Sequence, residues 1–356
     1  MTDATHDIIF SEMTGLLRRL IATPSFSREE SATADLIAAF LSDKGIAAER
    51  SGNNVIARTP AFNPAHPTWL LNSHHDTVRP APGYTRDPFS PDIEDDRLYG
   101  LGSNDAGASL VALLGAFLYF YGKGLPFNLV FAATAEEEIS GAGGISSVLD
   151  RLGPIDGALV GEPTGMQLAV AERGLVVIDA LVTGRAGHAA RNEGENAILK
   201  AMADIARLQQ GLFTRVSPLL GPVSATVTVI ETENKAHNVV PGTCRYVIDL
   251  RVNEFYTLEE AVDLLRNELQ AELAPRSLRL RSSIIAGDHP LVRAGIALGR
   301  NTYGSPTLSD KALMPFPALK IGPGDSARSH TADEYILLSE IREAITLYID
   351  LLKQSV

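Results

Sequence analysis

The chain has 356 residues, which predicts two domains or one large domain and excludes a single small motif-bearing module. Hydrophobic residues make up 45% and charged residues 21%, values near the average for globular proteins, so wholesale disorder is excluded. The formal net charge of -12 leaves no cationic excess for a phosphate backbone, and nucleic acid is therefore excluded as an expected partner.

The N-terminal part predicts helices that alternate with short apolar strands. Apolar residues at helical spacing up to Thr23-Pro24 predict a retained first helix, and Ser27-x-x-Glu30 has the capping-box pattern that opens a second. The uncharged stretch 106–122 is short for a bilayer and is expected to be a buried helix, so we expect a soluble cytoplasmic protein without membrane contact. Strands are expected at 54–58, 68–74, 127–134 and 159–161. This alternation is typical of an α/β sheet.

The pattern changes at about residue 172. Strands are expected at 175–183, 223–231, 243–251 and 278–285, with helices at 195–210 and after Thr257-x-x-Glu260. This β-α-β-β-α-β order is that of a two-layer, ferredoxin-like α+β domain. After His289 the sequence predicts a helix, a strand at 318–321 and a long helix opened by Thr331-x-x-Glu334. We therefore expect one domain formed by 1–171 and 285–356, into which a second, 172–284, is inserted.

Two motifs place charged or metal-binding side chains at predicted strand or helix ends. Strand 68–74 ends in His74-His75-Asp76, and period-two alternation puts His74 and Asp76 on one face, where the carboxylate can orient the imidazole for a metal. A solvated strand end is the alternative. Gly100-Leu101-Gly102-Ser103-Asn104-Asp105 begins like a dinucleotide fingerprint, but Asp105 replaces the third glycine and would repel a pyrophosphate. A helix-capping aspartate is the alternative here.

Carboxylates and a histidine follow further strands. Glu136-Glu137-Glu138 follows strand 127–134, and such a run loses solvation unless a cation or a proton compensates it; a solvated charged face is the alternative. Glu162 follows the next strand in Gly161-Glu162-Pro163, and His330 follows Gly322-Pro323-Gly324. Histidine and carboxylate at four junctions of one sheet suit divalent metal, with enough ligands for two ions.

The sequence lacks the motifs of other common catalytic and metal-binding sites. The one cysteine, Cys244, cannot close an internal disulfide or form a cysteine-rich zinc site. The sequence has no G-x-S-x-G nucleophile elbow, no H-E-x-x-H and no Walker lysine. Any metal must therefore be held by histidine and carboxylate side chains.

Taken together, the motifs resemble the M20 metallopeptidase family, which includes acetylornithine deacetylase, succinyl-diaminopimelate desuccinylase, carboxypeptidases and aminoacylases. The family pattern is His-x-Asp, Gly-x-Gly-x-x-Asp, a Glu-Glu pair, Gly-Glu-Pro, Gly-His in the inserted domain and a C-terminal His, and all six occur in this order. The resemblance implies a zinc-peptidase-like mixed sheet flanked by helices, with 172–284 as a lid and dimerisation domain. It also implies a homodimer that acts on a small molecule.

The resemblance implies two divalent cations, zinc first, with cobalt or manganese as alternatives. His74, Asp105 and Glu162 are the implied ligands of one cation. Asp105, Glu138 and His330 are the implied ligands of the other, so Asp105 bridges. In the family the bridging aspartate is followed by a cis peptide bond, which we expect between Asp105 and Ala106.

The remaining implied roles concern catalysis and substrate. Asp76 orients His74, and Glu137 is the general base that shuttles a proton. His188 in Gly187-His188 supplies a donor to the oxyanion, across the interface of the homodimer; a lid that closes on the site of its own subunit is the alternative. For the substrate's α-carboxylate, the implied contacts are Asn238, Arg251 and the amides of Gly322 and Gly324. A turn role for Asn238 and a surface ion pair for Arg251 are the alternatives.

Two departures from the family pattern affect the choice of substrate. Asp105-Ala106-Gly107-Ala108 stands where relatives have Asp-x-Lys-Gly, and Ser73 stands where they have glycine. We associate this branch with deacylases of arginine biosynthesis, so the expected reaction is removal of acetyl or succinyl from an α-amino group, with N-acetyl-L-ornithine first. Acylcitrulline, succinyl-diaminopimelate and a dipeptidase or carboxypeptidase activity are alternatives. A non-catalytic metal-binding protein is the alternative of another class, although the retained Glu137 argues against it.

Overall fold

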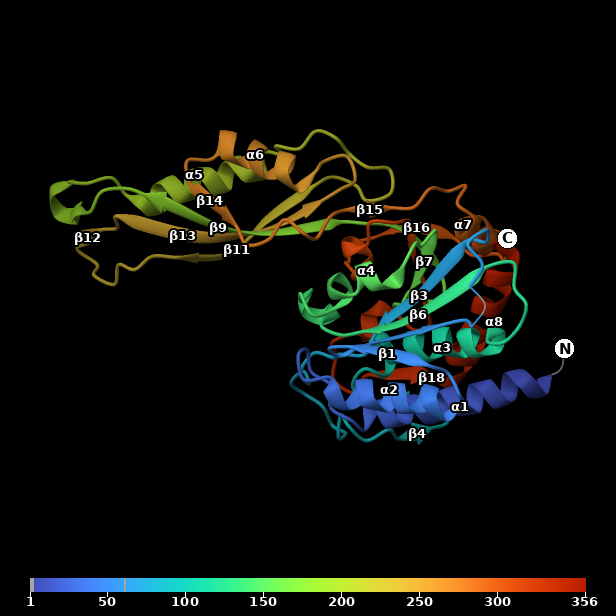
Figure 1. Ribbon diagram of the computed structural model, residues 1–356. Helices are drawn as coiled ribbons and strands as arrows, with labels where there is room; N and C mark the ends of the chain where they lie inside the picture. Colours follow the sequence, from blue (N-terminus) through green and yellow to red (C-terminus); the bar gives the residue numbers. More distant parts are fainter. Residues whose placement is uncertain (1–2, 61) are drawn as a thin grey trace. The chain divides into compact units, whose positions relative to one another are not determined.

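The computed structural model describes residues 3–60 and 62–356, which belong to two units. The first unit contains Met1–Val170, Ile285–Tyr303 and Ser309–Val356, and the second contains Ala171–Ile284 and Gly304–Leu308. Figure 1 shows the chain of both units, coloured along the sequence from the N-terminus to the C-terminus. Within the described ranges, no helix is both long and apolar enough to cross a membrane.

The strands of the first unit belong to a nine-stranded mixed sheet of order β1-β2-β6-β3-β7-β17-β8-β15, in which β16 also pairs with β8. Strands β6, β3, β7 and β17 are parallel neighbours, whereas β1, β2 and β8 pair antiparallel. A smaller sheet has the order β18-β5-β4. The strands are β1 (Ala48–Ser51), β2 (Asn54–Arg58), β3 (Thr68–His74), β4 (Ile93–Glu94), β5 (Arg97–Tyr99), β6 (Asn128–Thr134), β7 (Gly157–Val160), β8 (Leu168–Glu172), β17 (Ala318–Lys320) and β18 (Tyr335–Leu337).

Helices cover both faces of this sheet because its strands are apolar on both sides. Leu71 and Phe131 pack with helices α1, α3 and α8, whereas Leu70 and Val130 pack toward α4 on the other face. Figure 1 shows α3 beside α8, and α3 is buried throughout except for Leu118, as the uncharged stretch predicts. The helices are α1 (Asp3–Ile21), α2 (Ser31–Asp43), α3 (Ala108–Phe120), α4 (Leu149–Leu152), α7 (Pro290–Ala297) and α8 (Leu338–Gln354).

The second unit has an antiparallel sheet of order β11-β13-β9-β14, with α5 and α6 on one face (Figure 1). Alternate residues of β9, such as Val176 and Ile178, point under the helices and form a separate core with Val262 and Leu265. The elements are β9 (Gly174–Thr183), β10 (Gly187–His188), α5 (Ala197–Gln209), β11 (Ser224–Glu231), β12 (Val239–Val240), β13 (Thr243–Val252), α6 (Leu258–Glu268) and β14 (Glu272–Pro275). Two short strands, β15 (Ser283–Ile284) and β16 (Thr302–Ser305), pair with β8 in the nine-stranded sheet.

The predicted fold class is confirmed, but one predicted strand is wrong. The fourth strand of the second unit is β14, not 278–285, because Leu273 already pairs with Ala180 of β9 directly after α6. The alternating leucines and arginines of 278–281 have the pattern of a strand, but these residues are not in a strand. Of the predicted strand, only Ser283–Ile284 is β-paired, and its partner is β8.

Two of the three predicted capping boxes are also wrong. Thr257 and Glu260 exchange the expected hydrogen bonds at the start of α6. By contrast, α2 begins without a side-chain cap from Glu30, and α8 begins only at Leu338, where Glu340 accepts a hydrogen bond from the Leu337 amide. Glu30 and Glu334 are both buried and make their hydrogen bonds elsewhere.

Candidate metal site

The predicted ligands lie where parallel strands of the first unit end. At this edge of an α/β sheet, loops from neighbouring strands converge and binding sites form. One further ligand comes from the turn Ser103–Gly107 before α3. The predicted ligands are His74 at the end of β3, Glu138 after β6, Glu162 after β7, His330 after β17, and Asp105 in the turn; the predicted base, Glu137, directly precedes Glu138.

His74 occupies the centre of this group. Its Nε2 lies 3.4 Å from Oδ1 of Asp105, 3.8 Å from Oε1 of Glu162 and 4.0 Å from Oε2 of Glu137. The residue is 1% exposed, and Nε2 has no hydrogen-bond partner among the residues that the structure describes. A buried nitrogen that faces three carboxylates without a hydrogen bond has the surroundings of a metal ligand.

His330 forms a second centre with the same aspartate. Its Nε2 lies 3.0 Å from Oε2 of Glu138 and 3.6 Å from Oδ2 of Asp105. The two oxygens of Asp105 therefore face different histidines, Oδ1 toward His74 and Oδ2 toward His330. A carboxylate placed in this way can bridge two cations.

The compact ligand groups only partly match the predicted sets. Atoms of His74, Asp105 and Glu138 lie within 4.8 Å of one another, and so do atoms of His74, Glu137 and Glu162. The structure thus brings the predicted ligands together. It also places Glu137, the predicted base, within ligand distance of His74.

The electrostatics indicate negative charge that lacks compensation. Burial raises the pKa of Glu137 well above its usual value, and Glu162 adds to the rise. Burial likewise raises the pKa of Glu162 to about 8. Burial lowers the pKa of His74, but the carboxylates of Asp105 and Asp76 outweigh it and raise this pKa well above its usual value. Bound cations would relieve this accumulation of charge.

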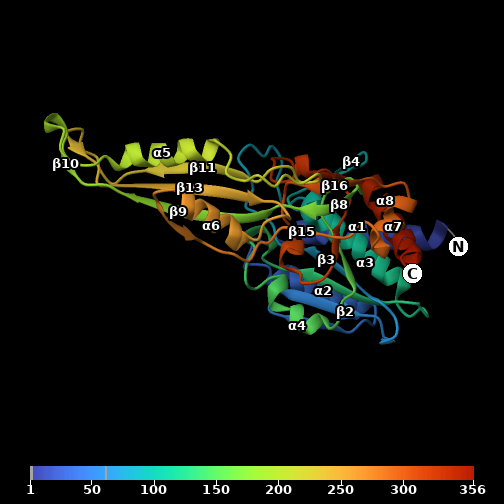
Figure 2. The ribbon, with the colours of Figure 1, turned by 90° about the horizontal axis from the view of Figure 1, so that it is seen from above.

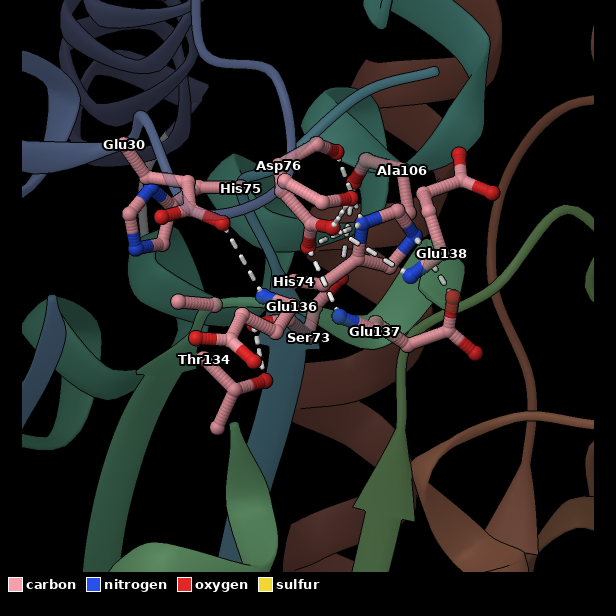
Figure 3. A network of polar contacts seen from close by, with 12 residues as sticks. Glu30, Ser73, His74, His75, Asp76, Ala106, Thr134, Glu136, Glu137 and Glu138 are labelled. Carbon is pink, nitrogen blue, oxygen red and sulfur yellow. Dashed lines mark hydrogen bonds and ion pairs between the residues drawn. The ribbon is translucent and has the colours of Figure 1, made fainter. Parts of the chain in front are cut away.

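Asp76 approaches His74, as predicted, and makes further contacts. Nδ1 of His74 lies 2.9 Å from the main-chain carbonyl of Asp76 but 3.4 Å from its carboxylate. The carboxylate also accepts hydrogen bonds from the amides of Glu137 at 3.0 Å and Glu138 at 3.2 Å (Figure 3). It accepts a third from the Ser27 hydroxyl at 2.7 Å. Asp76 therefore contacts His74 through its main chain and its carboxylate, and the carboxylate also holds the loop with Glu137 and Glu138.

The neighbours of these residues point away from the site. The His75 ring lies on the side away from His74, as strand alternation predicts (Figure 3). Its two nitrogens lie 2.9 Å from the Thr33 hydroxyl and 2.9 Å from the Asn53 carbonyl oxygen. The Glu136 carboxylate accepts from the Gly143 amide at 3.2 Å. Of the three consecutive glutamates, only the second and third therefore face the ligands.

Sequence reasoning missed Glu334 as a site residue. Its carboxylate accepts hydrogen bonds from the amides of Gly102, Asn104 and Asp105, at 3.0, 2.8 and 2.9 Å. The only signal was a glutamate four residues after His330, which the capping-box pattern assigned to a helix instead. Burial raises the pKa of Glu334 to about 8.

The departures from the family pattern have local explanations. A Cβ atom at Gly107 would lie 2.5 Å from the Gly102 carbonyl oxygen and 2.7 Å from a methyl group of Leu17, so the turn leaves no room for a side chain. The Ser73 hydroxyl donates a hydrogen bond to the Gly161 carbonyl at 2.8 Å. The peptide bond between Asp105 and Ala106 is cis, as predicted.

The glycine loop offers less than the sequence suggests. The Gly322 amide already donates to the Thr164 hydroxyl at 3.1 Å, and the Gly324 carbonyl accepts from the Gly165 amide at 2.7 Å. Of the two predicted amide contacts to substrate, Gly324 is therefore the better candidate.

Three predicted residues lie in the second unit. His188 of β10 pairs with Val239 of β12, and the amide after His188 donates to the Asn238 carbonyl at 3.0 Å, so His188 and Asn238 are neighbours. Arg251 binds Asp249 of its own strand through two hydrogen bonds, at 2.7 and 3.0 Å. The ion pair that was the alternative for Arg251 is therefore present.

These residues lie at opposite ends of the second unit's sheet. Thr243 pairs with Thr183 at the end that carries β10 and β12, whereas Arg251 pairs with Leu175 about eight residues along the same strand (Figure 2). At roughly 3.3 Å per residue, the two ends are about 26 Å apart.

Comparisons with known proteins agree on one family. The model of peptidase family M20/M25/M40 matches residues 70–354. A succinyl-diaminopimelate desuccinylase of Methylorubrum populi is 30% identical over 286 residues, covering 72% of each chain. One from Parvibaculum lavamentivorans is 25% identical over 94% of this chain and 93% of its own.

Solved structures share the fold. An M20 family metallo-carboxypeptidase of Sulfolobus solfataricus aligns with a TM-score of 0.78 at 18% identity, over 97% of this chain and 99% of its own. A dinuclear metal-binding M20 peptidase of Bacillus subtilis aligns with a TM-score of 0.73 at 16% identity, over 97% and 98%.

Proposed function

Because the chain belongs to peptidase family M20/M25/M40 and is a metallo-hydrolase of that family, we propose that it removes an acyl group from the α-amino group of an amino acid, using two cations. The observation that carries the proposal is Asp105, whose two oxygens face His74 and His330 separately. This arrangement supports two cations that share one ligand.

We assign His74, Asp105 and Glu162 to one cation, and Asp105, Glu138 and His330 to the other. The unpartnered Nε2 of His74 and the raised pKa of Glu162 support the first assignment. The short distance between His330 and Glu138 supports the second. Imidazole and carboxylate donors without thiolate suit zinc, with cobalt and manganese as alternatives.

Glu137 acts as the base in this mechanism. When bound, the cations supply Lewis acidity for the amide carbonyl and lower the pKa of water. The Glu137 carboxylate takes a proton from the water that attacks the carbonyl carbon, and delivers it to the amide nitrogen as the C–N bond breaks. The products are a free carboxylate and an amine. The Glu137 carboxylate lies 4.0 Å from Nε2 of His74, beside the proposed cations, which supports this role.

The names of the relatives favour a substrate different from the first expectation. Several are succinyl-diaminopimelate desuccinylases, so we place succinyl-diaminopimelate first and acetylornithine second. The expected link to arginine biosynthesis has no support among these relatives. Arg251 and Gly324 are proposed to hold a substrate carboxylate, which for Arg251 requires its release from Asp249.

A substrate panel tests this proposal. The purified protein, loaded with zinc or cobalt, is assayed for amine release from succinyl-diaminopimelate, acetylornithine, acetylcitrulline and a dipeptide. We expect kcat/KM for succinyl-diaminopimelate to exceed each other value by tenfold or more, roughly 1.4 kcal/mol of transition-state binding. A dipeptide cleaved fastest would identify a peptidase instead. A fully loaded protein that releases amine from none of them would contradict catalysis.

We also propose a homodimer in which His188 and Asn238 of one subunit serve the site of the partner. Within one copy of the second unit, Arg251 lies about 26 Å from the end that carries His188, farther than a small substrate reaches. Two copies must then contribute if all three residues serve one substrate. The exposed edge strand β11, with Val229 and Ile230 48% and 50% exposed, supports pairing with a second copy. The cytoplasmic location stays a prediction.

A further inference from the structure

We propose that Glu334 is a positioning residue for the cation assigned to Asp105, Glu138 and His330. The inference rests on the two-cation site proposed above. The Glu334 side chain binds the main chain of the turn that carries Asp105. Glu334 also lies on the same segment of chain as His330.

The carboxylate of Glu334 binds the turn that presents Asp105. Oε1 accepts from the amides of Asn104 and Asp105, and Oε2 accepts from the amide of Gly102. Glu334 is 2% exposed, so these charge-assisted hydrogen bonds are shielded from water. Three donors from four consecutive residues leave the turn little freedom to move.

The same segment of chain also carries His330. His330 has a φ of +59° and precedes Glu334 by four residues, so a change at Glu334 is transmitted over a short, tightly turned stretch. Asn104 makes a second link, because its amide group donates to the Asp325 carbonyl at 3.1 Å and to the Ser329 hydroxyl at 3.3 Å. The turn with Asp105 is thus tied to the chain on both sides of His330.

The main chain of Glu334 is held independently of any metal. Its carbonyl accepts a hydrogen bond from the Gly100 amide at 2.9 Å, and the next residue, Tyr335, pairs with Tyr99 in the small sheet. Helix capping does not explain the carboxylate, because α8 begins at Leu338 and uses Glu340. The side chain is therefore anchored at its base and directed at the ligand turn.

The two cations are expected to respond differently to the loss of this anchor. The cation assigned to His330 depends on the His330 side chain, which is 53% exposed, and on the turn with Asp105 that Glu334 holds. The other also has His74 and Glu162, which are buried and carried by β3 and by the loop after β7. Loss of the Glu334 hydrogen bonds should therefore weaken the cation at His330 most.

Glu334→Gln tests this directly. The amide keeps the shape of the side chain and one acceptor, but its NH₂ group then faces the Gly102 amide, donor against donor. We expect metal-free protein titrated with cobalt to retain one tight site and to bind the second ion roughly 10- to 100-fold more weakly, the usual cost of losing a partner that orients a ligand. The visible absorption of the second cobalt ion should change as well.

Asp204→Asn is the matched control. Asp204 is 2% exposed and accepts two main-chain amides and the Tyr246 hydroxyl, but it lies in the second unit. It should lower the unfolding temperature and leave both cobalt sites tight. Two tight sites in Glu334→Gln with a similar loss of unfolding temperature would show a merely structural role and overturn the proposal.

Two further outcomes keep the test decisive. If Glu334→Gln does not fold, Glu334→Asp is measured, because its shorter side chain cannot reach all three amides; the same weakening is expected, and two tight sites would refute the proposal. If the wild-type protein itself fails to bind two cobalt ions, the two-cation site is wrong, which is a failure distinguishable from that of Glu334.

Discussion

Glu137→Gln is expected to bind both cations as the wild-type protein does and to lose about 100- to 10,000-fold in kcat. The glutamine keeps the size of the side chain but cannot accept a proton, so the attacking water loses its base and the leaving nitrogen its donor. Glu138→Gln should differ, because Glu138 lies 3.0 Å from His330 as a proposed ligand and its loss should lower the metal content. Metal content and turnover are measured on the same samples.

Glu136→Gln is the control for this prediction. It lies next to Glu137, but its carboxylate contacts the Gly143 amide rather than the candidate ligands, so turnover should stay near that of the wild type. A Glu137→Gln protein that keeps a tenth of wild-type turnover would remove Glu137 from the role of base. Loss of metal together with turnover would make Glu137 a ligand, as its 4.0 Å distance from His74 also permits.

Mixing Glu137→Ala with His188→Ala subunits is expected to restore about a quarter of wild-type activity from two nearly inactive proteins. If His188 acts across the interface, each mixed dimer has one site with both residues intact. Random exchange makes about half of the dimers mixed, and half of the sites in each are intact. Activity is followed during subunit exchange, and light scattering gives the oligomeric state.

A mixture of Glu137→Ala with Glu137→Gln is the control and should recover nothing, because every site lacks the base. Absence of recovery in the first mixture after proven exchange would assign His188 to its own subunit. A monomer in solution would refute the homodimer itself.

The sequence could single out candidate ligands because His74, Glu138 and Glu162 lie at or directly after the ends of apolar strands, and Asp105 lies in a glycine-rich turn before an apolar helix. His74 and Asp105 lie in local motifs, and their chemistry can be recognised without knowledge of distant contacts. The convergence of these motifs follows from the parallel order of β6, β3, β7 and β17, since the carboxyl ends of parallel strands share one edge.

The residues that hold the ligands were missed because their partners are far away in sequence. Ser27 and Glu334 belong to patterns that locally indicate helix caps, yet the Ser27 hydroxyl binds Asp76 and the Glu334 carboxylate binds the turn with Asp105. Glu30 is similar, because it accepts the Glu136 amide at 3.2 Å. The capping box that is present, at Thr257, lies in the second unit. Local rules failed here where side chains support the site.

Sequence motifs also could not predict how far apart residues lie along the second unit's sheet. His188 and Arg251 were assigned to one substrate, and only the register of β13 with β9 reveals that they lie at opposite ends of one sheet. The bond between Arg251 and Asp249 likewise depends on side chains two residues apart on the same face of a strand. Both facts constrain how the substrate can be held.

Titration of zinc into metal-free protein, with turnover of succinyl-diaminopimelate measured at each step, tests the two-cation deacylase most directly. We predict two ions per chain and activity that rises with their binding. Burial raises the pKa of Glu162 to about 8, and Glu138 raises the pKa of His330 to about 9, so both side chains bind protons at pH 7. A metal must displace these protons, and zinc binding at pH 7 should therefore release them. Fewer protons should be released at pH 9. Full activity without metal, or no bound zinc at the site, would contradict the account.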